Sequence, residues 1–243
     1  MSGHSKWSTI KRKKGANDAQ RAKIFTKISR EILVAVKSGG PDPDNNSSLK
    51  DAISKARAAN MPNDNISRTI KKAAGSNDAD NYETVVYEGY GAGGVAVIVN
   101  TLTDNRNRTA ANIRHYFDKF GGNLGTSGCV SFMFDNKGVI VIENDGIDED
   151  EITMDALDAG AEDISYADDF IEITSTPEDF HAVRDSLEGK YTLSSAELSM
   201  VPQTMTALSD ENQITMMQRL LDNLDDDDDV QDVYHNWDMP EDM

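Results

Sequence analysis

The residues of this sequence with the clearest chemical potential are cations close to its beginning. Lys11-Arg12-Lys13-Lys14 is an uninterrupted basic run, and Lys6 stands beside Trp7 a few residues earlier. Such a run can neutralise the phosphates of a nucleic acid and release its counterions. The alternative is a solvated basic tail, which runs of this kind also form. Trp7 could stack on an unpaired base, but we favour a role in pinning this arm to the helices that follow.

Two predicted helices carry further cations on ordered surfaces. The first helix begins near Asn17 or Asp18, ends at Gly39-Gly40, and has apolar residues at helical spacing along one face. The opposite face of this helix carries Lys23, Lys27 and Arg30. The outward face of the third helix, over about 62–74, carries Arg68, Lys71 and Lys72. Basic stripes on rigid helices beside a basic arm favour nucleic acid as the partner.

Two arginines, Arg106 and Arg108, open another predicted helix, which Thr103 or Asp104 can cap. Cations in the first turn are disfavoured by the helix dipole unless an anion neutralises their charge. A phosphate held by helix amides and guanidinium groups would neutralise it. A salt bridge to a nearby carboxylate would do so equally well, and the sequence leaves both alternatives open.

The patterns that could indicate catalysis or metal binding are weak. Gly89–Gly94 matches a dinucleotide-binding pattern, but the residues after it read as a strand, so a Gly-rich hairpin is the better interpretation. Asp225–Asp229 could attract Mg²⁺, although adjacent aspartates on a loop are usually only solvated. The four histidines are scattered without ligand spacing. We therefore expect no enzyme activity, no catalytic residues, no cofactor and no metal ligands.

Charge is sharply divided along the chain. Residues 1–75 hold 16 Lys and Arg against 6 Asp and Glu, a net +10, whereas residues 76–243 hold 8 against 37, a net −29. One end can bind a polyanion, and we expect the acidic remainder to be held clear of it and to contact protein partners. The arm could also fold back onto the acidic body in the absence of a ligand.

Targeting and redox signals are few. Cys129 is the single cysteine, which excludes an intrachain disulfide and suits a reducing cytosol. The beginning of the sequence lacks the apolar core of a signal peptide, and no apolar run approaches a membrane span. We expect a cytoplasmic protein without a membrane partner.

Hydrophobic periodicity predicts an α+β protein of several domains. Residues 1–75 form a basic arm and a bundle of three helices, the second of which starts at Leu49. Residues 137–202 read as strand, helix, strand, strand, helix, strand, the ferredoxin-like order. Residues 82–135 and 203–243 give a second set of this kind, with strands expected at 129–134 and 204–208. We expect residues 137–202 to be inserted into this middle domain through two short connections, near Asn136 and Gln203.

Several segments, spread over the whole chain, are similar to hallmark segments of the YebC/PmpR family. They are Gly3-His-Ser-Lys-Trp7, Lys23-Ile-Phe-Thr-Lys27, Ala58-Ala-Asn-Met-Pro62, Tyr87-Glu-Gly-Tyr-Gly91, Thr103-Asp-Asn-Arg-Asn-Arg-Thr109, Gly121-Gly-Asn-Leu-Gly125 and Val233-Tyr-His-Asn236. Ala92 and Cys129 depart from the Pro and Ser that the family often has. The resemblance implies a cytoplasmic protein of three domains, helical at its N-terminus, without catalysis.

The resemblance also implies a role in gene expression, with competing assignments. The family is described as probable transcriptional regulators that bind DNA, and its mitochondrial relatives are described as translational activators of cytochrome c oxidase. Bacterial members have also been assigned a role on the ribosome, in the synthesis of proline-rich stretches. We expect foremost a DNA-binding transcriptional regulator, and keep as the alternative a ribosome-associated translation factor that binds ribosomal RNA.

Overall fold

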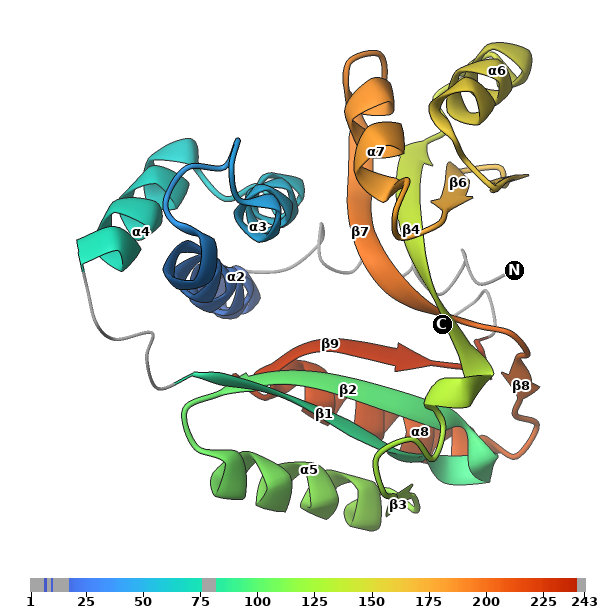
Figure 1. Cartoon of the computed structure of the whole chain (residues 1–243). Coiled ribbons are helices and arrows are strands. Elements are labelled where there is room, and N and C mark those ends of the chain that lie inside the picture. Colours follow the sequence, from blue (N-terminus) through green and yellow to red (C-terminus); the bar gives the residue numbers. More distant parts are fainter. Residues whose placement is uncertain (1–6, 8–9, 11–17, 76–81, 240–243) are drawn as a thin grey trace.

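The computed structural model describes residues 7, 10, 18–75 and 82–239. Figure 1 shows three parts: the helices of residues 18–75 at the left, one sheet below, and a second sheet at the upper right. The fold is α+β with antiparallel four-stranded sheets, as the periodicity predicts. In the described residues, no helix combines the length and the hydrophobicity that crossing a bilayer requires.

The helical part consists of α2 (Asp18–Gly39), α3 (Ser47–Ala58) and α4 (Asn63–Gly75). Its core is built from the apolar faces of all three helices, with Ile28, Ile32 and Leu49 at its centre. Asn46, rather than a residue next to Leu49, caps α3: its Oδ1 accepts a hydrogen bond from the Leu49 amide at 3.1 Å. The three predicted helices are therefore confirmed, with small shifts of their ends.

The first sheet has the order β3-β1-β2-β9 and is antiparallel throughout. Its elements are β1 (Glu83–Tyr90), β2 (Ala96–Thr103), α5 (Arg106–Lys119), β3 (Asn123–Leu124), α8 (Glu211–Asp226) and β9 (Val230–His235). Helices α5 and α8 cover one face, where Val97 and Val99 of β2 contact their apolar residues. Ala96 and Ile98 point to the other face, because side chains alternate along a strand.

Two strands expected in this sheet are not there. Residues 129–133 form a loop and the short 3₁₀ helix η3 (Ser131–Met133), and Phe134 already begins the next strand. Strand β8 (Thr206–Ala207) pairs with β10 (Trp237–Asp238) in a separate two-stranded sheet. The edge of the sheet beside β1 is instead formed by the two-residue strand β3. Ser131 cannot continue a strand here because Glu88 accepts hydrogen bonds from the Val130 and Ser131 amides, at 3.0 and 2.9 Å.

The Gly-rich segment between β1 and β2 forms the predicted hairpin. It contains the 3₁₀ turn η2 (Ala92–Gly94), in which Gly93 and Gly94 adopt φ values of 68° and 80°. Residues with a Cβ rarely adopt this left-handed conformation, which explains the glycines without invoking a nucleotide.

The second sheet has the order β5-β6-β4-β7, the ferredoxin-like arrangement. Its elements are β4 (Phe134–Glu143), α6 (Glu149–Ala159), β5 (Asp163–Tyr166), β6 (Phe170–Ser175), α7 (Phe180–Glu188) and β7 (Leu193–Pro202). Helices α6 and α7 cover one face, with Ile140, Ile142, Ile171 and Ile173 beneath them. The strand and helix order predicted for residues 137–202 is confirmed.

A ribbon of two long strands, β4 and β7, connects the two sheets (Figure 1). Asn136, near which one of the two connections is expected, lies inside this ladder, opposite Met200. We propose the domain boundaries 1–75, 82–135 with 203–243, and 137–202. The pairing of β9 with β2 is compatible with them, because it returns the end of the chain to the first sheet.

Candidate nucleic-acid interface

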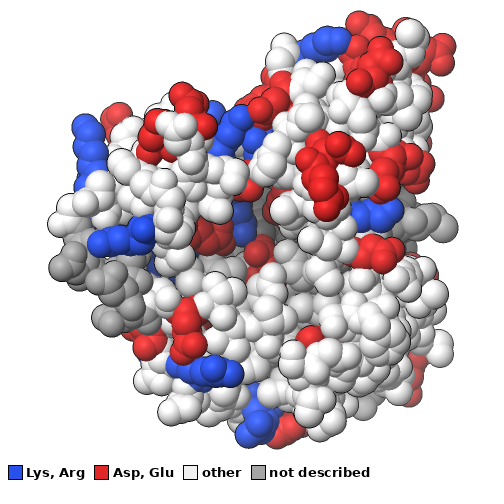
Figure 2. Space-filling view, in the orientation of Figure 1, with Lys and Arg blue, Asp and Glu red and all other residues white. Residues whose placement is uncertain are grey.

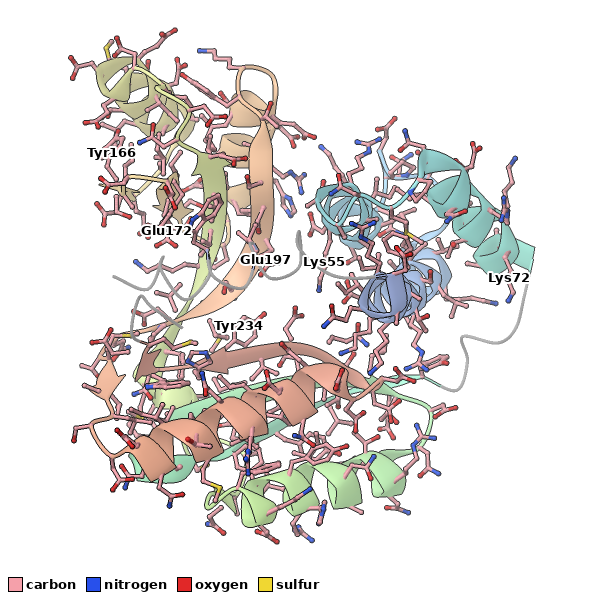
Figure 3. All side chains as sticks on the ribbon, turned by 180° about the vertical axis from the view of Figure 1, so that it is seen from behind. Lys55, Lys72, Tyr166, Glu172, Glu197 and Tyr234 are labelled. Atoms are coloured by element: carbon pink, nitrogen blue, oxygen red, sulfur yellow. The ribbon has the colours of Figure 1, made fainter. Side chains whose placement is uncertain are left out.

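The outer face of α4 carries three of the predicted cations in an open arrangement. Arg68, Lys71 and Lys72 are all exposed, and their i, i+3, i+4 spacing places them on one face of the helix. In the described part of the chain, none of the three makes an ion pair or a side-chain hydrogen bond. Figure 3 shows Lys72 at the outer edge of the molecule, pointing away from both sheets. We call Arg68, Lys71 and Lys72 the α4 cations.

Like charges at this spacing repel one another, so the bare surface is unfavourable until an anion approaches. The nearest carboxylate in α4 itself is Asp64, in the first turn, where the helix dipole already favours it. The α4 cations can therefore receive several phosphates without first breaking a contact to another described residue.

A shallow groove of about 350 Å³ lies between α2 and α4 beside the α4 cations. It is lined by apolar and polar side chains, those of Phe25, Thr26, Ser29, Met61, Asn65, Arg68 and Thr69. The hydroxyls of Thr26, Ser29 and Thr69 bond to carbonyls of their own helices. Among the described residues, the side chains of Asn65 and Arg68 make no such bond, so their polar groups are available for a ligand.

The cations of α2 are arranged differently, because they face the run Asp225–Asp229, which comprises the end of α8 and the turn before β9. Lys23 Nζ lies 2.8 Å from Asp226 Oδ1, and this hydrogen bond raises the pKa of Lys23. Lys27 Nζ donates to the Asp225 carbonyl at 2.6 Å, and Arg30 donates to the Asp228 carbonyl at 2.6 Å. The acidic body is therefore not held clear of the basic helices, contrary to the expectation from the charge division.

Asp229 is the most buried carboxylate of this run, with 4% of the residue exposed. Its Oδ2 accepts hydrogen bonds from Arg108 at 2.6 Å and from Thr109 at 2.8 Å, and its Oδ1 lies 3.4 Å from Arg30. Burial alone would raise the pKa of Asp229, but the bonds from Arg108 and Thr109 outweigh it and lower the pKa. One carboxylate thus joins α2, α5 and β9.

The structure contains the salt bridges that were the alternative to a phosphate site at Arg106 and Arg108. Arg108 pairs with Asp104 at 2.9 Å as well as with Asp229, and the exposed Arg106 lies 4.0 Å from Glu83. Asn105 caps α5, not Thr103 or Asp104, because its Oδ1 accepts from the Arg108 amide at 3.1 Å. A phosphate at this helix start stays a prediction, and it would have to compete with Asp229.

A cavity of about 460 Å³ lies where α2, α3, β7 and α8 meet. Figure 2 shows a hollow near the centre of this face with basic and acidic side chains around it. In Figure 3, Lys55 from α3 and Glu197 from β7 lie on opposite sides of the cavity, which both residues line. Lys55 pairs with Glu31 at 2.8 Å and with Asp232 at 3.0 Å. Burial lowers the pKa of Lys55, but the two carboxylates outweigh it, so the pKa is raised overall.

The Trp7 side chain packs against the second sheet. Its ring stacks on Phe170 with centroids 5.3 Å apart, and with Ile10 it packs on Val139 and Val141 of β4. The expectation that Trp7 pins the arm to the helices is therefore wrong. Trp7 packs instead on the apolar face of β4 that α6 and α7 do not cover. The predicted cations Lys6 and Lys11–Lys14 lie outside the described residues.

The sequence reasoning missed a second contact between the helical part and the body. Arg184 of α7, with 1% of its side chain exposed, donates to Asp51 of α3 at 2.5 Å, and Lys50 pairs with Asp185 at 2.6 Å. No local signal could have found these pairs, because their partners are about 135 residues apart in the sequence. Among the described residues, no group of three His, Cys, Asp or Glu side chains could hold a metal ion.

Comparison with known proteins agrees with this architecture. The model of the TACO1/YebC N-terminal domain matches residues 5–76, and the model of the TACO1/YebC second and third domain matches residues 82–237. The chain belongs to the TACO1/YebC family. The family resemblance of the sequence segments is therefore confirmed.

Relatives within this family are similar over nearly their whole length. A protein of Acetivibrio thermocellus named "Probable transcriptional regulatory protein" is 63% identical, over 98% of this chain and 99% of the relative. One of Finegoldia magna with the same name is 59% identical, with the same coverage. The crystal structure of a conserved hypothetical protein from Aquifex aeolicus is 43% identical and superposes with a TM-score of 0.81, covering 92% of both chains.

Proposed function

We propose that this protein is a nucleic-acid-binding regulator of gene expression, without catalytic activity, that works in the cytoplasm. The α4 cations make the first contact with the phosphate backbone, together with the basic arm, Lys6 and Lys11–Lys14. Duplex DNA is the preferred target, because close relatives are named probable transcriptional regulatory proteins. Ribosomal RNA is the alternative target.

The observation that carries this proposal is the contrast between α4 and the other basic surfaces. Arg68, Lys71 and Lys72 are exposed and make no ion pair within the described residues. Lys23, Arg30 and Arg108, in contrast, each donate to an acceptor within the protein. Three cations on about one turn of an ordered helix suit a row of phosphates, and each phosphate neutralised releases counterions.

The groove beside α4 supports contacts to DNA bases in addition to electrostatic contacts with phosphates. Asn65 and Arg68 line it, and these are the side-chain types that read adenine and guanine edges in the major groove. Phosphate contacts would position the helix, and these two side chains would supply what sequence preference it has.

The test is a variant with R68Q, K71Q and K72Q, assayed by fluorescence anisotropy against a labelled DNA duplex over a range of salt. We expect weaker binding and a salt slope smaller by up to about 0.9 for each lost phosphate contact. The matched control, R114Q, K119Q and R219Q, changes the same charge on exposed positions of α5 and α8. Equal affinity and slope for the α4 variant and the parent would overturn the proposal.

The same variants distinguish the two targets by sedimentation through a sucrose gradient. A DNA regulator stays at the top of the gradient, and the α4 substitutions leave that position unchanged. Migration with ribosomal particles that the α4 substitutions abolish would replace DNA by ribosomal RNA as the target, with the same cations in contact with it.

A further inference from the structure

The basic face of α2 lies against the acidic run Asp225–Asp229. Lys23, Lys27 and Arg30 follow one another at i, i+4 and i+7, so they form a single row along the helix. Each of the three meets a different residue of Asp225–Asp229: Asp226 at 2.8 Å, Asp225 at 2.6 Å and Asp228 at 2.6 Å. A row of cations on α2 thus lies against acceptors at the end of α8 and in the turn that follows it.

A phosphate backbone that lay along this face of α2 would contact the same three cations. Two of the three contacts go to main-chain carbonyls of Asp225 and Asp228, which carry only partial charge. Phosphate oxygens are stronger acceptors for Lys and Arg than carbonyl oxygens are. The exposed carboxylate of Asp228 adds negative charge close to this row without a side-chain hydrogen bond in the described residues.

The covering contact is also weak enough to be exchanged. The side chains of Lys23 and Asp226 are 47% and 70% exposed, and exposed ion pairs contribute little to stability and are screened by salt. The pair of Arg184 with Asp51 and the contacts of Asp229 with Arg108 and Thr109 are better buried, and they do not involve Lys23 or Lys27. A ligand of high charge density can therefore compete for Lys23 and Lys27 while the fold stays intact.

We infer that the row Lys23, Lys27 and Arg30 is a second polyanion-binding surface, covered by Asp225–Asp229 and exposed when a phosphate backbone displaces that run. The acidic run then acts as an internal competitor that restricts binding to ligands with enough charge to displace it. This inference shares with the proposed function only the chemical class of the ligand, because it concerns a surface distinct from the α4 cations.

The decisive variant neutralises the run without disturbing its anchors. We choose D225N, D226N and D228N, and keep Asp229 and also Asp227, which accepts hydrogen bonds from Tyr116 and Asn112 at 3.1 and 3.2 Å. The matched control is E149Q, D150N and D158N on exposed positions of α6, which adds the same net charge far from α2 along the chain. Circular dichroism and thermal melting establish that both variants fold.

The probes are a short labelled DNA duplex and a short labelled RNA hairpin, measured by anisotropy over a range of salt. Because the covering pairs are individually weak, we expect neutralisation of the run to raise affinity by about tenfold for at least one probe, with a steeper salt slope. The α6 control should bind as the parent does. Adding K23Q and K27Q to the neutralised run should abolish the gain.

Two results would overturn the inference: no gain in affinity, or an equal gain in the α6 control, which would show a general charge effect. Its failure is distinguishable from failure of the proposed function. A parent that binds through the α4 cations, with no gain on neutralising the run, removes only the second surface. A gain that depends on Lys23 and Lys27, with no effect of the α4 substitutions, removes only the first.

Discussion

Arg184 of α7 and Asp51 of α3 form a 2.5 Å ion pair between parts of the chain that are 133 residues apart. The Arg184 side chain is 1% exposed and also donates to Asp185 through Nε and Nη2, each at 3.1 Å. This guanidinium therefore depends on carboxylates from two elements to be buried at all. It joins the helical part to the second sheet, on the side where α3 faces β7.

The first prediction concerns this pair. D51N removes the charge that answers Arg184 across the contact, and we expect the free energy of unfolding to fall by about 1–3 kcal/mol. The matched change, K50Q, removes the neighbouring exposed pair with Asp185 and should cost at most about 1 kcal/mol. Urea unfolding followed by circular dichroism measures both. Equal losses in the two variants would show that burial of Arg184 does not depend on Asp51.

The second prediction concerns pH and Asp229. The pKa of Asp229 is lowered in the folded protein, so its ionised form stabilises the fold above the unfolded pKa of about 4, and this contribution is lost as pH falls through the folded pKa. D229N should therefore lower stability by roughly 2 kcal/mol at pH 7 and by much less at about pH 3. The difference between parent and variant, measured by thermal melting across this range, should shrink as pH falls. A constant difference would mean that the carboxylate charge is not what joins Arg30, Arg108 and β9.

The third prediction concerns Trp7. Because its ring is buried on Phe170 and β4, W7A should lower the free energy of unfolding by up to roughly 3 kcal/mol. The chain has two tryptophans, so W237F leaves Trp7 as the single indole reporter. In that background, Trp7 emission should not respond to an added DNA duplex or RNA hairpin. Strong quenching on binding would instead support stacking of Trp7 on a base.

Much of the fold could be predicted from the sequence because its signals are local. The helices α2, α3 and α4, the hairpin at Gly89–Gly94 and the strand order of residues 137–202 follow from periodicity and turn residues. The strand expected at 129–134 failed because its apolar residues cover β2 as a loop, held by Glu88. Strand β3 was missed because two residues carry no periodic pattern.

The candidate site was predictable only as a set of cations. Helical spacing put Lys23, Lys27 and Arg30 on one face and Arg68, Lys71 and Lys72 on another, and both faces looked alike in the sequence. The two faces differ because Asp225–Asp229, about 200 residues beyond α2, covers the cations of α2 and not those of α4. No property of either segment alone could indicate which of the two helices it would meet.

The sequence by itself determined where charge is concentrated and which residues repeat at helical or strand spacing, because these are properties of neighbours along the chain. Tertiary structure decided which cations are covered and which stay open, since that depends on how the β4–β7 ribbon and the pairing of β9 with β2 return the chain. Ion pairs act through space over a few ångströms, so their partners are set by the path of the backbone rather than by sequence distance.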